Sequence, residues 1–232
     1  MTEYKRIVIK ISGEALSDGS NAISGKSAEI LATQLKEIVK IGVQTCVVVG
    51  GGNIWRGRTS AGMDRTTADS IGMLATVMNG LALSEALTAC GVKNKVVSSL
   101  SVANVVDADS VSDVIEYLNE GKLVIFVGGT GLPYFSTDTA LTLRACEIHA
   151  DAIFFMKNVD GIYDSDPKTN PNAKKYDEIS FDRILKDNLQ AMDMTAAAMC
   201  REYGMTAVAL GKDEKNGILR VLKGEKLGTI IK

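Results

Sequence analysis

The feature that most constrains this chain is the repeated alternation of short apolar runs with segments of helical periodicity. Runs rich in β-branched residues occur at 7–9, 46–49, 95–97, 123–127, 152–155, 207–210 and 229–231. Continuously apolar strands are typical of a sheet that is covered on both faces. Between the runs, apolar residues recur at helical spacing, as at Leu31, Leu35 and Ile38, and glycines such as Gly42 follow as helix stops. The pattern predicts an α/β fold, a three-layer αβα sandwich around a mainly parallel sheet.

Composition and charge narrow the classes of function. The 232 residues include 26 Lys and Arg and 28 Asp and Glu, a formal charge of -2, so no basic excess favours a nucleic-acid partner. The single histidine, His149, argues against Ser-His-Asp catalysis and against a multi-histidine metal site. We therefore expect the chemistry to depend on Lys, Arg and Asp side chains and on backbone amides.

The sequence predicts a cytoplasmic protein with no membrane-spanning segment. Residues 1–6 lead directly into the first predicted strand, with no apolar leader peptide. The longest apolar stretch, 71–83, is interrupted by Asn79 and is shorter than the roughly 20 residues that span a bilayer. No Cys-x-x-Cys spacing is present, so we expect reduced thiols at Cys46, Cys90, Cys146 and Cys200.

A polar stretch from Asp164 to Lys175, which contains Pro167 and Pro171, marks a possible division of the chain. We interpret it as the border between two lobes of one domain, an N-terminal lobe of about 1–164 and a C-terminal lobe of about 165–232. A single fold of this length can bury one sizeable core.

Glycine clusters follow three of the predicted strands. They are Lys10-Ile11-Ser12-Gly13, Gly50-Gly51-Gly52-Asn53 and Gly128-Gly129-Thr130-Gly131. Ligands of open α/β sheets bind beyond the carboxyl ends of the strands, where glycines let backbone N–H groups converge on an anion. Strand-to-helix turns need glycine in any case, which can explain one such cluster. Three clusters at equivalent strand ends predict a phosphate site.

A further glycine pattern at 19–27 resembles the P-loop signature. Five residues rather than four separate Gly19 from Gly25, and the segment does not directly follow a predicted strand. We therefore expect Lys26 and Ser27 to be ordinary residues at the start of a helix.

Three charged residues are candidates for phosphate chemistry. Lys10 lies in an apolar strand, where it needs an anion or a carboxylate partner, unless the strand ends at Ile9 and the side chain is solvated. Arg56 offers a fork of donors for phosphate oxygens. Asp138 could cap a helix that begins at Thr139, or pair with a buried lysine.

Taken together, these motifs resemble the bacterial-type uridylate kinases of the amino acid kinase superfamily, from about Tyr4 to the C-terminus. The motifs that carry the resemblance are 10–15, 50–57, 69–81, 129–138 and 159–163 with Asp166-Pro167. Lys10 and the glycine triplet alone would equally fit acetylglutamate, glutamate, carbamate or aspartate kinases. The assignment to the uridylate kinase subfamily therefore depends on the segment that begins at Asp69 and on the loop 130–138.

The resemblance implies phosphorylation of UMP to UDP by ATP and Mg²⁺, in pyrimidine nucleotide biosynthesis, by a cytoplasmic homohexamer. It places UMP and the phosphates in the N-terminal lobe and ATP in the C-terminal lobe, and it assigns no residue as a metal ligand. The acceptor is a phosphate monoester, whose second pKa of about 6 leaves it largely ionised at neutral pH. In-line phosphoryl transfer then needs no general base.

The resemblance also assigns the site residues by position. It implies that ATP is bound by Lys10, Ile11, Ser12, Gly13, Gly52, Arg56, Tyr163 and Asp166. It implies that UMP is bound by Gly51, Asp69, Thr130, Gly131, Leu132, Pro133, Tyr134, Phe135, Ser136 and Thr137, with Asp69 at the ribose. The implied catalytic residues are Lys10, Arg56 and Asp138, of which Asp138 orients the lysine. Relatives commonly have Thr or Asn two residues before Val159, where this chain has Lys157, so no ATP contact is assigned there.

Two other functions stay open at this point. One is a kinase of a carboxylate or carbamate with the same fold. The other is a nucleotide-binding hexamer without catalysis, which would be expected to have lost Lys10 or Asp138. Both residues are present, which favours an enzyme.

Overall fold

An eight-stranded sheet forms the centre of the computed structural model, which describes residues 4–56 and 62–232. The strand order is β3-β4-β2-β1-β5-β9-β10-β8, and neighbours are parallel except for β10, which runs antiparallel to β9. The strands are β1 (Arg6–Ile11), β2 (Gln44–Val49), β3 (Asn94–Ser98), β4 (Leu123–Val127), β5 (Ala152–Lys157), β8 (Glu178–Ile179), β9 (Thr206–Gly211) and β10 (Thr229–Ile231). A separate antiparallel hairpin pairs β6 (Ile162–Tyr163) with β7 (Lys175–Tyr176).

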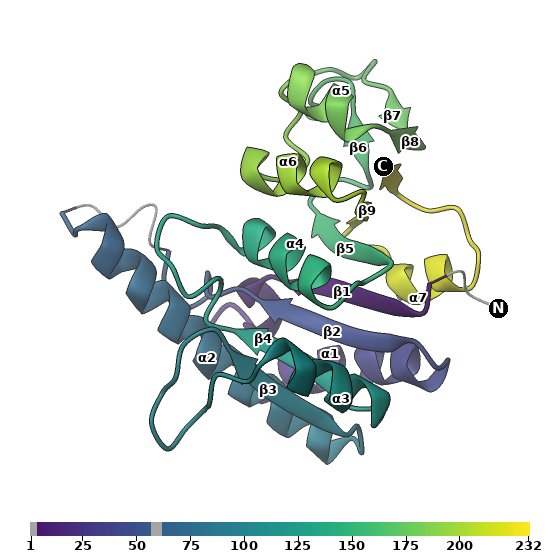
Figure 1. The fold of residues 1–232 in the computed structure, drawn as a ribbon. Helices are drawn as coiled ribbons and strands as arrows, with labels where there is room; N and C mark the ends of the chain where they lie inside the picture. The colour runs from purple at the N-terminus through teal and green to yellow at the C-terminus, as the bar shows by residue number, and fades with distance from the viewer. Residues whose placement is uncertain (1–3, 57–61) are drawn as a thin grey trace.

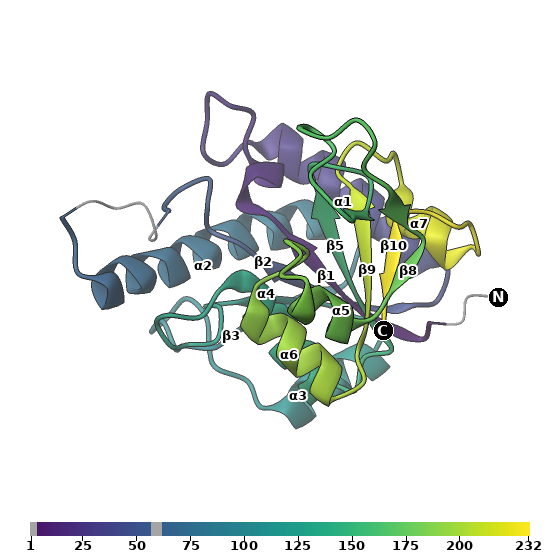
Figure 2. The ribbon, with the colours of Figure 1, turned by 90° about the horizontal axis from the view of Figure 1, so that it is seen from above.

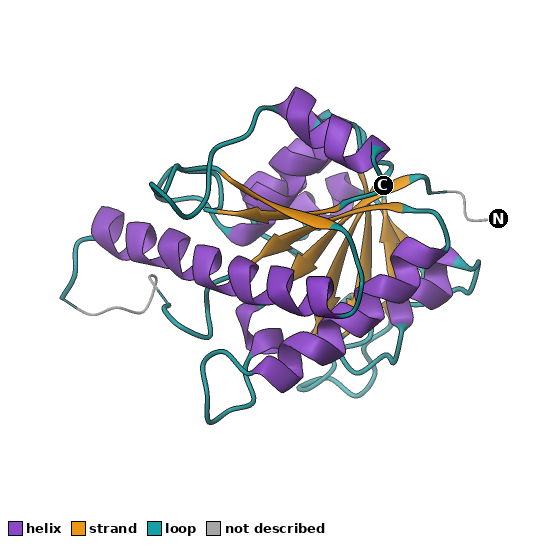
Figure 3. Cartoon of the chain, turned by 90° about the horizontal axis from the view of Figure 1, so that it is seen from below, coloured by secondary structure: helices purple, strands orange, loops and turns teal. Residues whose placement is uncertain are grey.

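Helices cover both faces of the sheet, so the predicted three-layer sandwich is confirmed (Figures 1, 2 and 3). One face carries α1 (Gly25–Lys40), α2 (Arg65–Ala89) and α7 (Gly217–Leu222). The other carries α3 (Val111–Asn119), α4 (Thr137–Glu147), α5 (Phe181–Lys186) and α6 (Met194–Glu202). A 3-10 helix, η1 (Gly13–Leu16), follows β1. The sheet continues across the predicted border at residue 165, so the division into two lobes stays a prediction.

Side chains of β1 alternate between the two layers. Ile7, Ile9 and Ile11 are buried on the face of α1 and α2, whereas Val8 is buried on the face of α4. Because β1 extends to Ile11, Lys10 continues the alternation on the face of Val8 and lies under α4. The alternative in which the strand ends at Ile9 is therefore wrong.

The segment 19–27, which resembles a P-loop in sequence, leads into α1 and includes its first three residues. Ser24 is the N-cap residue, and its side chain accepts a hydrogen bond from the Ser27 amide. Gly25, Lys26 and Ser27 lie in the first turn of the helix, so they are helix-start residues as expected.

Helix α2 has 25 residues and is longer than the apolar stretch 71–83 predicted from the sequence. By length and composition it is the one helix within the described ranges that could cross a membrane, a test that core helices of soluble proteins also pass. Here it packs on α1, η1, β2, β3 and β4. Its N-cap Asp64 accepts hydrogen bonds from the Thr66 and Thr67 amides.

A glycine in α2 allows the helix to approach the sheet closely. Gly80 is buried, and a Cβ atom there would overlap Val127 Cγ1 of β4. Alanine normally stabilises a helix relative to glycine, but here the overlap outweighs helix propensity. We expect Gly80→Ala to lower the free energy of unfolding by about 1–3 kcal/mol, measured by urea denaturation.

Gly72→Ala provides the matched control in the same helix. Its Cβ would lie 3.9 Å from Trp55 Cδ1, which is ordinary van der Waals contact. This variant should be neutral or stabilising by up to about 1 kcal/mol. Equal stability changes for both variants would contradict a specific overlap at Gly80.

Candidate active site

The loops after β1 and β2 meet at the carboxyl edge of the sheet. The Gly50 amide donates to the Ile11 carbonyl at 2.8 Å. A Cβ atom on Gly13 would lie 2.9 Å from the Gly52 amide nitrogen and would overlap the Asn53 side chain. Only glycine therefore fits at position 13, and two of the predicted glycine clusters form one continuous surface.

Lys10 and Asp138 form an ion pair beside these loops. The Lys10 Nζ to Asp138 Oδ1 distance is 2.6 Å, and the two side chains are 27% and 17% exposed, so both remain accessible to a substrate. The lysine comes from β1, and the carboxylate comes from the first turn of α4. Of the two roles considered for Asp138, pairing with a lysine is confirmed. The capping role is wrong, because α4 begins at Thr137 and Ser136 is its N-cap residue, accepting from the Asp138 amide.

A cavity of about 420 Å³ opens between α2 and the loop that follows β4. Residues predicted to bind UMP that line it are Gly51, Asp69, Thr130, Leu132, Phe135, Ser136 and Thr137. We call it the acceptor cavity. Arg56 and Gly52, which were assigned to ATP, also line it. Among the described residues, Gly131, Pro133 and Tyr134 are not part of its wall.

The carboxylate of Asp69 is held in place on the wall of the acceptor cavity. Its Oδ2 accepts from Arg65 Nε and from the Tyr134 amide, each at 2.7 Å. The Arg65 guanidinium also lies over the Tyr134 ring, 5.4 Å from the ring centroid. Tyr134 therefore contributes to the site by orienting Asp69 through its backbone.

Arg56 joins the loop after β2 to η1. Its Nη2 forms an ion pair with Glu14 Oε1, and its Nε donates to the Gly52 carbonyl at 3.3 Å. The guanidinium is largely exposed at the rim of the acceptor cavity. Glu14, which belongs to the first motif of the sequence, thus holds the arginine that was predicted to bind phosphate.

A second cavity of about 290 Å³ lies next to the β6–β7 hairpin. Tyr163 and Asp166, both predicted to bind ATP, line it together with Lys157, Val159 and other residues of the segments 161–167 and 188–190. We call it the donor cavity. The Tyr163 hydroxyl donates to Asp160 Oδ1 at 2.6 Å, a bond that raises the pKa of Tyr163 and lowers that of Asp160.

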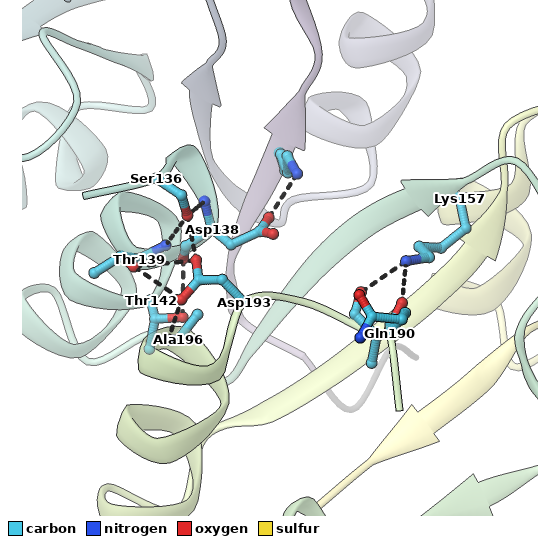
Figure 4. A network of polar contacts seen from close by, with 10 residues as sticks. Ser136, Asp138, Thr139, Thr142, Lys157, Gln190, Asp193 and Ala196 are labelled. Carbon is cyan, nitrogen blue, oxygen red and sulfur yellow. Dashed lines mark hydrogen bonds and ion pairs between the residues drawn. The ribbon is translucent and has the colours of Figure 1, made fainter. Parts of the chain in front are cut away.

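A third cavity of about 500 Å³ connects the two ends of the site. It shares Ser136 with the acceptor cavity and Lys157 with the donor cavity, and Asp138 lines it between them. Figure 4 shows Asp138 next to Asp193 and Lys157 next to Gln190. Asp138, which holds Lys10 by an ion pair, therefore lines the cavity that lies between the acceptor cavity and the donor cavity.

Two residues of this region were not assigned from the sequence. Lys157 is the last residue of the apolar strand β5, and Lys10 is the last residue but one of β1, so the same pattern could have identified Lys157. Asp193 caps α6 and also accepts from Ser136 Oγ and, at 3.1 Å, from Thr139 Oγ1 of α4. No sequence pattern indicated Asp193, because its partners at the start of α4 are distant in the chain.

Ile11 and Ser12, which were also predicted to bind ATP, directly follow Lys10 in the chain. Ile11 is buried at the end of β1, and Ser12 precedes η1 as its N-cap residue. Both line a further cavity of about 410 Å³ together with Lys10, and this cavity is bounded by α1 and by the segment 212–219. Within the described residues, no group of three or more His, Cys, Asp or Glu side chains could hold a metal ion.

A comparison with protein-family models identifies the family of this chain. The family model described as "Amino acid kinase family" matches residues 5–209. The chain belongs to the amino acid kinase family. The matched range contains the Lys10–Asp138 pair and all residues named above on the acceptor and donor cavities.

Within the amino acid kinase family, the chain is similar to several solved kinases over its whole length. It is 42% identical to the UMP kinase of Ureaplasma parvum, with a TM-score of 0.91 and 98% of each chain covered. It is 37% identical to the UMP kinase of Bacillus anthracis, with a TM-score of 0.94 and coverage of 98% of this chain and 96% of that one. The uridylate kinase of Archaeoglobus fulgidus is 26% identical, with a TM-score of 0.73 and 100% of both chains covered.

Proposed function

We propose that this protein is a UMP kinase, which transfers the terminal phosphoryl group of ATP to the phosphate of UMP and releases UDP and ADP. The observation that carries the proposal is the Lys10–Asp138 ion pair, whose carboxylate lines the cavity between the acceptor and donor cavities. The similarity to two UMP kinases at 42% and 37% identity supports the choice of UMP as acceptor.

The proposed mechanism uses alignment and charge neutralisation. A phosphate oxygen of UMP attacks the terminal phosphorus of ATP in line, and the bond from that phosphorus to the bridging oxygen of ADP breaks. The attacking oxygen is already ionised near neutral pH, so no side chain has to remove a proton. The Lys10 ammonium and the glycine-loop amides stabilise the charge on the transferring group, and Asp138 keeps the ammonium at its position.

Magnesium would enter this site together with the nucleotide. Mg²⁺ is commonly held by substrate phosphates and one or two carboxylates, rather than by a complete cage of protein ligands. Asp138 fits that mode, because its carboxylate lines the third cavity, next to the proposed phosphate path. Bound there, Mg²⁺ would neutralise phosphate charge and align the reacting groups.

The proposal is tested by offering several acceptors to the purified protein with Mg-ATP and measuring ADP release. We expect selective turnover of UMP over CMP, dUMP, N-acetylglutamate, aspartate, glutamate and carbamate. Selective turnover of a carboxylate or carbamate would retain the phosphotransfer site but contradict UMP as the acceptor. ATP binding without turnover of any acceptor would favour a non-catalytic nucleotide-binding protein.

Asp69 provides a prediction for the acceptor cavity. In the proposed complex its fixed carboxylate accepts hydrogen bonds from the ribose of UMP, so Asp69→Ala should weaken UMP binding. We expect the KM for UMP to rise about 10- to 100-fold, the effect of losing a hydrogen bond to a charged group, while the KM for ATP stays within about threefold. Steady-state kinetics with each substrate varied in turn measures both values.

Glu85→Ala is the control for this prediction. Glu85 lies on the same helix but is not part of the acceptor cavity. Both KM values should therefore remain close to those of the unmodified protein. An equal rise of the two KM values in Asp69→Ala would contradict a specific role for Asp69 at UMP.

We further propose that the protein is a cytoplasmic homohexamer that acts in pyrimidine nucleotide biosynthesis and has no nucleic acid or membrane partner. In this proposal the residues at about 1–164 form the lobe that binds UMP, and those at about 165–232 form the lobe that binds ATP. Exposed apolar side chains on one stripe of α2 support self-association: Leu74, Met78 and Leu81 are 48%, 53% and 39% exposed. Light scattering coupled to size-exclusion chromatography would measure the mass of the assembly.

A further inference from the structure

Asn79 is a polar side chain in the buried part of α2. Its exposed fraction is 0%, and nearby residues of the helix, Val77 and Leu83, belong to the apolar core that α2 forms with the sheet. Burial of an amide costs free energy unless its polar atoms find partners, and an apolar side chain of similar size would avoid that cost. The partners of Asn79 therefore indicate its role.

The side chain of Asn79 holds the glycine loop that follows β2 at two points. Its Nδ2 donates to the Gly50 carbonyl and to Asn53 Oδ1, each at 2.7 Å. Asn53 Nδ2 donates in return to Asn79 Oδ1 at 3.0 Å. Because the two amides pair in both directions, neither side chain can turn without breaking hydrogen bonds.

The Asn53 side chain also lies against the loop that follows β1. A Cβ atom on Gly13 would overlap Asn53 Oδ1, so the two loops are in direct contact there. Asn53 Nδ2 donates to the Ala22 carbonyl at 2.6 Å as well, in the segment that leads into α1. The Asn79–Asn53 pair therefore fixes the loop after β2 relative to both neighbouring segments.

The hydrogen bond to Gly50 sets the direction of the next backbone amide. The Gly50–Gly51 peptide is trans, so the Gly50 carbonyl and the Gly51 N–H point in opposite directions. Since the carbonyl points to Asn79, the Gly51 N–H points away from it. Gly51 lies on the wall of the acceptor cavity, and within the described part of the chain its amide makes no hydrogen bond. An unpaired backbone N–H at a cavity wall is a donor for an anion.

We infer that Asn79 is a positioning residue for the acceptor, which directs the Gly51 amide toward the phosphate of the bound nucleotide. Asn53 keeps the Asn79 amide in the orientation that this requires. Neither side chain lines the acceptor cavity, so both act through the glycine loop. A donor that is oriented before the substrate arrives stabilises a charged group without reorganisation. The inference rests on the proposed function, because it takes a phosphate monoester as the ligand of the acceptor cavity.

A purely structural role is the alternative explanation, in which Asn79 only holds α2 against the end of β2. Loss of such a role would disturb the whole cavity and weaken the binding of every ligand. A misdirected Gly51 amide would instead weaken only the contact with phosphate. Uridine and UMP differ by the phosphate alone, so their two dissociation constants separate the two roles.

The experiment is a ligand-observed NMR titration of the full-length protein with UMP and with uridine. Asn79→Leu retains the approximate size of the side chain but removes its three hydrogen bonds to Gly50 and Asn53. We expect the dissociation constant of UMP to rise about 10- to 100-fold, and that of uridine to stay within about threefold. An equal rise for both ligands, or no rise for UMP, would overturn the inference.

Asn53→Ala is a second variant, which carries the test if Asn79→Leu does not fold. It leaves the bond from Asn79 to the Gly50 carbonyl in place but removes the amide that restrains Asn79. The dissociation constant of UMP should rise about 3- to 10-fold, with uridine again within about threefold. Unchanged binding of UMP by a folded Asn53→Ala would contradict the role of the pair.

Asn94→Leu is the matched control. Asn94 Oδ1 accepts from Ser84 Oγ at 2.6 Å and its Nδ2 donates to Thr88 Oγ1 at 3.1 Å, so it also holds α2 by an amide, but it is not part of the acceptor cavity. It should bind UMP and uridine as the unmodified protein does. If the unmodified protein binds UMP no better than uridine, the proposed function and the inference both fail. If it prefers UMP and Asn79→Leu retains that preference, only the inference fails.

Discussion

Replacement of Lys10 by alanine is expected to reduce kcat about 100- to 1000-fold, with a change in the KM for UMP of less than about threefold. Lys10 is the cation that a carboxylate fixes at the carboxyl end of the central strand β1, 2.6 Å from Asp138. Its contribution is greatest when charge moves to the transferring phosphoryl group, so its loss affects turnover more than binding of the acceptor. Steady-state kinetics with Mg-ATP saturating and UMP varied measures both constants.

Lys26→Ala is the control for this experiment. Lys26 belongs to the segment that resembles a P-loop in sequence, but it is an exposed residue in the first turn of α1. Its replacement should leave kcat within about twofold of the unmodified value. Near-normal turnover in Lys10→Ala, with ADP release still dependent on UMP, would exclude Lys10 from the mechanism. Loss of turnover in Lys26→Ala would instead revive the P-loop interpretation.

The arrangement of the main layers could be predicted because every strand of the central sheet except β8 contains a short apolar run. Ile7, Val8 and Ile9 are all buried, since helices cover both sides of β1. The glycine clusters follow from the same reasoning, because parallel strands bring their carboxyl ends to one edge. Lys10 was identifiable as a charged residue that continues such a strand.

The connection between the donor cavity and α4 could not be predicted in this way. Strands β6 to β8 have only two residues each, too few for a periodic pattern. Asp193 reaches Thr139 across a separation of 54 residues, and Lys157 reaches Gln190 across 33. Such contacts depend on how α6 and the preceding segment pack, which local sequence does not determine.

Asp138→Asn is expected to lower kcat about 10- to 100-fold, which is less than the effect of Lys10→Ala. The asparagine retains the size of the side chain and its place in the first turn of α4, and the N-cap bond from the Asp138 amide to Ser136 involves only the backbone of residue 138. What is lost is the negative charge that holds the Lys10 ammonium at 2.6 Å. Without that charge, the ammonium samples positions in which it does not contact the transferring phosphoryl group.

The double variant Lys10→Ala/Asp138→Asn decides whether Asp138 acts through the lysine. If Asp138 acts only by positioning Lys10, then replacing Asp138 has no further effect once Lys10 is absent. The double variant should then have about the same kcat as Lys10→Ala alone. Independent roles would instead multiply the two losses, giving a reduction of at least about 1000-fold.

The exposed pair Lys40–Glu37, 2.6 Å apart on α1, is the reference for an ion pair without a catalytic role. Its variants Lys40→Ala and Glu37→Gln should leave kcat unchanged, singly and together, because exposed pairs contribute about 1 kcal/mol or less to stability and this one lies outside the three cavities of the site.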